Sequence, residues 1–165
     1  MSVQALVKFD NPILKKVLKP VKNFEDVENI ISNMYDTMYE NDGIGLAANQ
    51  IGIDLNIIIV DLSHIDSNFH PKTYINGKIL EKTGSKIMEE GCLSLPKIKL
   101  EVNRAEKIYF YYEDKNGNPF KEDLNGLLST VIQHEMDHVN GRLIIDYVSK
   151  IQKQQFLKTL QKLHE

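Results

Sequence analysis

The sequence predicts an α+β fold in which short, mainly antiparallel strands wrap around one central helix. Helically spaced apolar residues occur in three separate stretches, and runs rich in β-branched and aromatic residues lie between them. A turn signal containing glycine and proline follows one of these runs. The chain shows neither internal repeats nor linker-like composition, so we expect residues 1–165 to form a single domain.

The first predicted helix begins after a polar stretch that contains Asn23 and, three residues later, Asp26. Either side chain can accept hydrogen bonds from the free N–H groups at a helix start. The apolar residues that follow share one face of the helix: Val27, Ile30, Ile31, Met34 and Met38.

The middle of the chain supplies the strands. Residues 56–62 (Asn-Ile-Ile-Ile-Val-Asp-Leu) are typical of a buried strand. The polar loop after it contains His64 and His70, which have no other candidate ligands nearby and are expected to be exposed and unrelated to a metal. Residues 107–113 are rich in strand-forming residues, and Asp-Lys-Asn-Gly-Asn-Pro at 114–119 predicts a hairpin turn.

The central helix is predicted over residues 126–140, followed by a glycine that can end it. It contains the run His-Glu-Met-Asp-His, in which His134 and His138 lie one turn apart on one face and can bind one divalent metal. Glu135 lies beside them and could act as a general base toward water. Both histidines fall on the stripe expected to face the core, where a buried imidazole pair needs polar partners; the stripe is Leu127, Val131, His134 and His138.

A third protein ligand separates the classes of metal site. A metzincin would carry a third histidine where Ile144 stands, so that class is excluded. The only acids further on are Asp146 and Glu165, and neither has a surrounding motif. The single cysteine, Cys92, lies upstream in Glu-Gly-Cys-Leu-Ser-Leu-Pro. A lone cysteine is often inert packing, but a thiolate with two imidazoles would make three ligands and leave a fourth position for water, as in catalytic sites.

A further segment, Gly-Ile-Gly-Leu-Ala-Ala-Asn-Gln at residues 43–50, precedes the cysteine segment and the histidine segment in the chain. In this order and at these separations the three segments resemble peptide deformylase. The similarity runs from Pro-Ile-Leu-Lys at 12–15 to the Asp-Tyr pair at 146–147. The resemblance implies a peptide deformylase-like fold with a C-terminal helix. It also implies hydrolysis of the formyl group from the N-terminal formyl-methionine of nascent polypeptides, which would be the partners of this protein.

The resemblance implies a role for each motif residue. Glu135 would be the general acid/base. Gln50 and the backbone N–H of Leu93 would stabilise the negative oxygen of the tetrahedral intermediate, where one fixed donor is typically worth about 3 kcal/mol. Gly43 and Gly45 would let a peptide substrate approach the backbone closely. The metal ligands would be Cys92, His134 and His138.

A pocket for the methionine side chain is expected beside the site, although plain core packing is the alternative role for its apolar residues. Glu90 and Arg104 stand where the family has an acid and an arginine, and they could pair to orient the Cys92 turn or His134; the alternative is a surface ion pair. At Lys99 many members have arginine, and lysine cannot make the same two-pronged contact. The expected substrate-contacting residues are Ile44, Gly45, Met88, Gly91, Leu127 and Val131.

The donor set limits the metal to one divalent ion without fixing its identity. Two imidazoles and a thiolate bind Zn²⁺ more tightly than Fe²⁺ in the usual affinity order. The resemblance implies Fe²⁺ in the cell, whereas purified protein could hold Zn²⁺, Ni²⁺ or Co²⁺.

Residues 149–165 form a predicted amphipathic helix with four lysines and one acid. It is either a docked helix with a solvated lysine face or a transient contact with ribosomal RNA. The net charge of −3 gives no reason to expect general nucleic-acid or DNA binding. We find no membrane-spanning stretch, signal peptide or transit peptide, and a single cysteine suits a reducing compartment, so a cytoplasmic location is expected.

Two other function classes use the same residues. A zinc amidase or endopeptidase would cleave internal peptide bonds. This chain lacks the downstream metal ligand of such enzymes, and its small size leaves little room for a long substrate cleft. A non-catalytic metal-binding or ribosome-associated module would need neither Glu135 nor Gln50.

Overall fold

The structure is a computed structural model in which residues 2–164 are described. Within this range there are three α-helices, seven strands and three short 3₁₀ helices. The helices are α1 (Val27–Glu40), α2 (Gly126–Val139) and α3 (Lys150–Leu163), with η1 (Pro12–Lys15), η2 (Ala48–Ile51) and η3 (Ile144–Tyr147). The strands are β1 (Gly45–Ala47), β2 (Ile57–Val60), β3 (Lys72–Thr83), β4 (Lys86–Cys92), β5 (Leu95–Arg104), β6 (Lys107–Glu113) and β7 (Pro119–Asn125).

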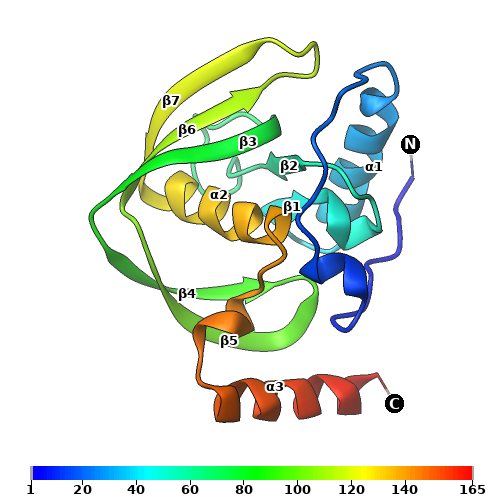
Figure 1. Ribbon diagram of the computed structural model, residues 1–165, viewed down its shortest axis with the longest axis vertical. Coiled ribbons are helices and arrows are strands. Elements are labelled where there is room, and N and C mark those ends of the chain that lie inside the picture. The colour runs from blue at the N-terminus through cyan, green and yellow to red at the C-terminus, as the bar shows by residue number, and fades with distance from the viewer. Residues whose placement is uncertain (1, 165) are drawn as a thin grey trace.

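Every strand pair is antiparallel. Five strands form one sheet in the order β1-β2-β3-β6-β7, and β4 and β5 form a separate hairpin. Figure 1 shows α2 lying between the five-stranded sheet and this hairpin, with α3 on the far side of the hairpin. The predicted α+β class with a central helix is confirmed. The strands are not all short, because β3 has 12 residues and β5 has 10.

Helix α1 packs against β1 and β2 through an apolar cluster. Val27, Met34 and Met38 of its predicted face are buried. The predicted cap is wrong in detail. Asp26 occupies the N-cap position but makes no side-chain cap hydrogen bond. Asn23 instead accepts from the N–H of Glu25, two residues on, so it stabilises the preceding turn.

Helix α2 is fixed by the largest apolar cluster, which joins it to β2, β3 and β6. It ends at Val139, one residue before the predicted end. Gly141, two residues after the end of α2, has a left-handed backbone conformation with φ of 75°. A Cβ at this position would lie 2.6 Å from the carbonyl oxygen of Lys15. Only glycine tolerates that conformation and that approach, so the predicted stop is confirmed.

A third apolar cluster packs residues of the hairpin against Phe9, η3 and α3. Helix α3 begins with a capping box in which Ser149 accepts from the N–H of Gln152. Leu160 of α3 is fully buried in this cluster. The predicted basic helix therefore docks on the hairpin, and Glu165, included in its predicted range, lies outside the described residues together with Met1.

Other sequence predictions fare well. The predicted 56–62 strand is β2, shortened to four residues, and the 107–113 strand is β6 without change. His64 and His70 are exposed, as expected. Within residues 2–164, no helix combines the length and the apolar character that crossing a bilayer requires. That the chain forms a single domain stays a prediction.

Candidate metal centre

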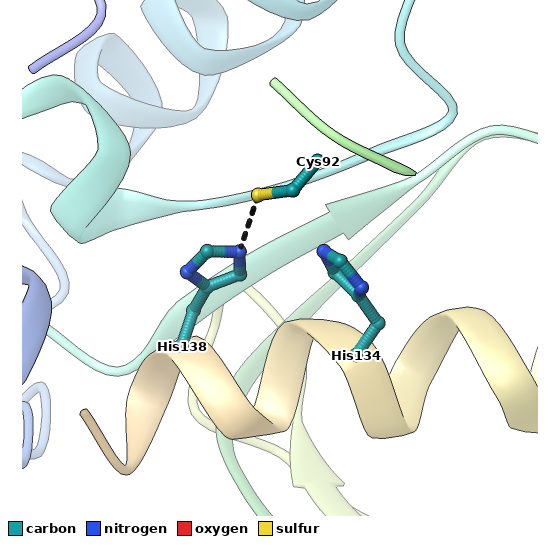
Figure 2. Close-up of side chains that lie close together, drawn as sticks. All are labelled: Cys92, His134 and His138. Carbon is teal, nitrogen blue, oxygen red and sulfur yellow. Dashed lines mark hydrogen bonds between the residues drawn. The ribbon is translucent and has the colours of Figure 1, made fainter. Parts of the chain in front are cut away.

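Three candidate ligands from distant parts of the chain meet beside α2. Cys92 ends β4, and His134 and His138 project from α2 one turn apart (Figure 2). One ligand atom from each side chain lies within 4.8 Å of the other two. The Sγ of Cys92 is 3.3 Å from Nε2 of His138. The hairpin thus brings the upstream thiol to the histidine face, as the sequence analysis expected.

Two of the three ligands, Cys92 and His134, line a cavity of about 620 Å³ between the hairpin, α2 and the segment before β1. Lys99, Leu93 and Gln50 also line it. The structure brings every predicted substrate-contacting residue to this wall: Ile44, Gly45, Met88, Gly91, Leu127 and Val131. Their contact with a substrate stays a prediction, but their common location satisfies its geometric requirement.

Gly45 lies against the face of α2 that carries Glu135 and Val131. A Cβ at this position would be 2.8 Å from Oε1 of Glu135 and 3.0 Å from Cγ1 of Val131. Such separations are below normal van der Waals contact, so β1 can approach α2 this closely only with glycine. Glycine is therefore required at position 45 for packing, in addition to its predicted role of giving a substrate access to the backbone.

The carboxyl group of Glu135 is buried at the edge of the cluster, with the residue 3% exposed. Its Oε1 is 4.0 Å from Nε2 of His134, and its Oε2 has no hydrogen-bond partner among the described residues. Burial raises the pKa of Glu135 to about 7, although the charge of His134 opposes the shift. A carboxyl group with such a pKa can both accept and release a proton near neutrality.

Gln50 is buried beside the thiol. Its Oε1 accepts from the N–H of Ala47 at 3.0 Å, which fixes the orientation of the amide. Its Nε2 donates to Oγ of Ser94 at 3.0 Å and lies 3.9 Å from Sγ of Cys92. Both amide hydrogens therefore have acceptors, and the one directed at the weakly accepting sulfur is the one that could turn to a ligand in the cavity.

Glu90 and Arg104 form a buried pair rather than a surface one. Arg104 donates to both carboxylate oxygens of Glu90 at 2.8 Å, and Nδ1 of His134 is 2.9 Å from Oε1 of Glu90. Burial alone would raise the pKa of Glu90, but the hydrogen bonds from Arg104 and His134 outweigh it and hold the pKa below its ordinary value. The other ring nitrogen of His134, Nε2, lies 4.0 Å from Oε1 of Glu135 and is available to the cluster.

The network continues to two residues that the sequence analysis did not single out. The second guanidinium arm of Arg104 contacts Asp137 at 2.5 Å, and the hydroxyl of Tyr147 donates to the same carboxylate at 2.7 Å. Asp137 stood in the histidine motif and offered a signal, because an acid beside buried histidines needs a partner. Tyr147 gave no such signal, since its role depends on the approach of η3 to α2.

These donors fit one divalent metal ion. A thiolate and two imidazoles are typical ligands of Zn²⁺ and of other first-row divalent ions. The Glu90 contact at Nδ1 of His134 is the usual orienting partner of a histidine ligand, and it selects Nε2 for the metal. Cys92, His134 and His138 could therefore hold the ion.

Comparison with known proteins gives consistent matches. The family model described as polypeptide deformylase matches residues 3–154. The peptide deformylase of Legionella pneumophila is 35% identical, with a TM-score of 0.91 over 99% of this chain and 96% of that chain. That of Thermotoga maritima is 39% identical, with a TM-score of 0.84 over 90% and 99%. That of Synechococcus elongatus, solved in complex with actinonin, is 38% identical, with a TM-score of 0.86 over 93% and 85%.

Proposed function

The chain belongs to the polypeptide deformylase family and is a deformylase hydrolase, and on this premise we propose that it removes the formyl group from the N-terminal formyl-methionine of newly made polypeptides and releases formate. The observation that carries the proposal is the buried carboxyl group of Glu135 beside the cluster of Cys92, His134 and His138. One of its oxygens has no partner among residues 2–164, and Glu135, Cys92 and His134 line the same cavity.

Glu135 is proposed as the group that moves the proton. Its carboxylate takes a proton from the attacking water and later gives it to the nitrogen of the departing methionine amine, so that the C–N bond breaks with a neutral leaving group. The pKa of about 7 suits both steps. Burial excludes bulk water from this carboxyl group and keeps the transferred proton local.

Gln50 and the backbone N–H of Leu93 are proposed as donors to the negative oxygen that forms on the formyl carbon. The Gln50 amide is held by Ala47 and Ser94, so its second N–H, which points at Sγ of Cys92, is already oriented beside the candidate metal ligands when the charge develops. A donor fixed in advance stabilises the transition state without reorganisation.

Cys92, His134 and His138 are proposed to hold one divalent ion, with Glu90 and Arg104 orienting His134. When bound, the ion supplies a Lewis acid that lowers the pKa of water and polarises a carbonyl oxygen. We propose Fe²⁺ as the ion in the cell, because deformylase resemblance implies it, with Zn²⁺, Ni²⁺ or Co²⁺ in purified samples.

The substrate's methionine side chain is proposed to occupy the apolar part of the cavity formed by Ile44, Met88, Leu127 and Val131. Thr130, which also lines the cavity, donates to Sδ of Met88 at 3.7 Å and fixes that side of the pocket. Gly45 and Gly91 leave room for the peptide backbone. Because nascent chains are the substrate, we place the activity in the cytoplasm, and a ribosome contact through α3 is kept as a proposal.

The test is formate release from formyl-Met-Ala-Ser, with the same peptide lacking formyl as the matched substrate. The formylated peptide should yield formate, and the other should stay intact. Glu135→Ala should retain the metal yet lose about 10²–10⁴-fold in turnover. Cleavage of internal bonds would identify an endopeptidase instead, and absence of both reactions in metal-loaded protein would indicate a binding module.

The metal is tested by stripping the protein and reloading matched aliquots anaerobically with Fe²⁺, Ni²⁺ or Zn²⁺. We expect the ferrous and nickel forms to release formate much faster than the zinc form, because zinc prefers four ligands. Air should inactivate the ferrous form. Cys92→Ser should lose metal on dialysis, since its hydroxyl stays protonated near neutral pH. Equal rates in all three metal forms, together with a ferrous form that is stable in air, would contradict the assignment of iron. The three proposed metal ligands would be unaffected by that result.

A further inference from the structure

Two buried polar atoms without a hydrogen-bond partner lie on residues that already contact each other. They are Nδ1 of His138 and Oδ1 of Asn49, and neither has a partner among the described residues. The Nδ2 of Asn49 donates to the backbone oxygen of His138 at 2.9 Å, across 89 residues of sequence. An orphaned donor and an orphaned acceptor therefore belong to one contact between η2 and the end of α2.

The orientation of His138 decides what its second nitrogen requires. Nε2 lies 3.3 Å from Sγ of Cys92, so this nitrogen faces the candidate metal centre. Figure 2 shows the other ring nitrogen turned away from Cys92 and His134. A neutral imidazole carries its proton on one nitrogen only. If the lone pair of Nε2 binds a metal, Nδ1 must carry the proton and needs an acceptor.

The two histidines differ in their support. His134 has the carboxylate of Glu90 at 2.9 Å from its Nδ1. The corresponding nitrogen of His138 is enclosed, since the residue is 1% exposed, so bulk water cannot serve as its acceptor. Asn49 is fully buried and has one unused carbonyl oxygen. A buried N–H and a buried C=O that both stay unpaired are costly, and pairing them removes both costs.

We propose that Asn49 is the positioning residue for His138. Its Oδ1 accepts the Nδ1–H of His138 through one buried water, and so holds the neutral ring with Nε2 toward the metal. This inference rests on the proposed metal role of His138. It assigns η2 two tasks, because Gln50 on the same turn faces the thiol of Cys92 while Asn49 supports a histidine from behind.

A purely structural role for Asn49 is the alternative that the test must separate. The backbone oxygen of His138 also accepts the N–H of Gly141 at 3.1 Å, so the Nδ2 contact of Asn49 caps the end of α2. That capping task uses the amide nitrogen of Asn49, whereas the positioning task uses its oxygen. A variant that removes one and keeps the other distinguishes them.

The experiment uses full-length protein, loaded with Zn²⁺ and labelled with ¹⁵N at histidine, and observes the ring nitrogens of His138 by NMR. In the unmodified protein Nδ1 should carry a slowly exchanging proton. Asn49→Leu should make that proton exchange rapidly and weaken zinc binding, measured by chelator competition, by about 10–100-fold. Asn49→Asp keeps an acceptor oxygen and loses the capping amide, so it should retain the protected proton while its melting temperature falls.

Asn56→Leu is the matched control. The buried Oδ1 of Asn56 also has no partner within the described part of the chain, but its amide donates to the backbone of Gly77, away from the metal ligands. It should leave the His138 signal and the zinc affinity unchanged.

A rapidly exchanging Nδ1 proton in the unmodified zinc protein would overturn the inference without any variant. So would Asn49→Leu protein that matches Asn56→Leu in both readouts. Unmodified protein that binds no zinc would overturn the metal centre itself, and the inference with it.

Discussion

The two sides of the candidate metal centre are held in place by different forces. Helix α2, with both histidines, is held by apolar packing, since Ile132, Met136 and Val139 are buried against the five-stranded sheet. The hairpin that carries Cys92 is joined to α2 by a charged network through Arg104 and Asp137. Apolar packing adjusts to small changes, whereas a buried charged network loses its balance when one member is removed. The meeting of thiol and imidazoles therefore depends most on the polar side.

The largest effect is expected from Arg104→Met, which removes the cation from the polar side. Glu90 would keep only its contact with His134, and Asp137 only the hydroxyl of Tyr147. Because the cation shared by the two buried or partly buried carboxylates is lost, the free energy of unfolding should fall by about 3–5 kcal/mol. Zinc affinity should fall as well, because Glu90, no longer fixed by Arg104, would hold His134 less firmly. Urea unfolding and chelator competition measure the two quantities.

The matched control on the apolar side is Ile132→Val. It shortens a fully buried side chain and should cost about 0.5–1.5 kcal/mol of stability, without a change in zinc affinity. Equal losses of zinc affinity in the two variants would show that the two sides are not supported differently.

The next effect concerns the metal-free protein and the pKa of Glu135, which is raised from 4.5 to about 7. Because the folded pKa exceeds the unfolded one, the neutral carboxyl group stabilises the fold fully below pH 4.5, and this contribution is lost as pH rises through about 7. At about 1.4 kcal/mol per pKa unit, the loss amounts to about 3 kcal/mol.

Glu135→Gln stays neutral at all pH values and should escape this loss. The stability difference between the variant and the unmodified protein, both metal-stripped, should therefore shift by about 3 kcal/mol in favour of the variant between pH 4.5 and pH 7.5. Unfolding titrations in urea at several pH values provide the measurement. A difference that does not change with pH would contradict the raised pKa.

Gly45→Ala tests how closely the apolar side is packed. The added Cβ would press on Oε1 of Glu135 and on Val131. A displacement of the carboxyl group should lower kcat on the order of 10–100-fold. Metal content, measured in the same samples, should stay constant, because the clash does not reach Cys92 or the imidazoles. Loss of metal together with activity would show that the two sides are coupled through β1.

The smallest effect is expected at the outer end of the polar side. Tyr147→Phe removes the hydroxyl that donates to Asp137 at 2.7 Å but keeps the ring beside Arg104 and Arg142. Tyr147 is 39% exposed, so water can replace the hydroxyl, and the cost should be about 1 kcal/mol. Thermal unfolding measures it. A loss as large as that of Arg104→Met would mean that the hydroxyl is an inner member of the network.

The sequence predicted those parts of the site whose signal is local. The spacing of His134 and His138 is a property of one helix, and α2 differs from its prediction by one residue. The length of β3 was missed because burial changes along it, from buried residues near its start to exposed residues at its end, so no single alternation marks it. Strand β5 does alternate between buried and exposed residues from Ile98 to Arg104, and that local signal was overlooked. Asn49 gave no signal at all, since its partner lies 89 residues away and only the packing of η2 on α2 creates the contact.

The apolar cluster under the hairpin unites residues from opposite ends of the described chain. Phe9 and Leu160 both belong to it, and the ring of Phe9 stacks on that of His164 with centroids 5.7 Å apart. Contacts of such sequence separation carry the largest loop-closure entropy and form late in folding. The buried members of the cluster around α1, β1 and β2 all come from the first half of the chain, so this cluster can condense earlier. During synthesis the cysteine's hairpin would therefore stay loosely seated until α3 has emerged, and the ability to retain a metal would be among the last properties the folding chain acquires.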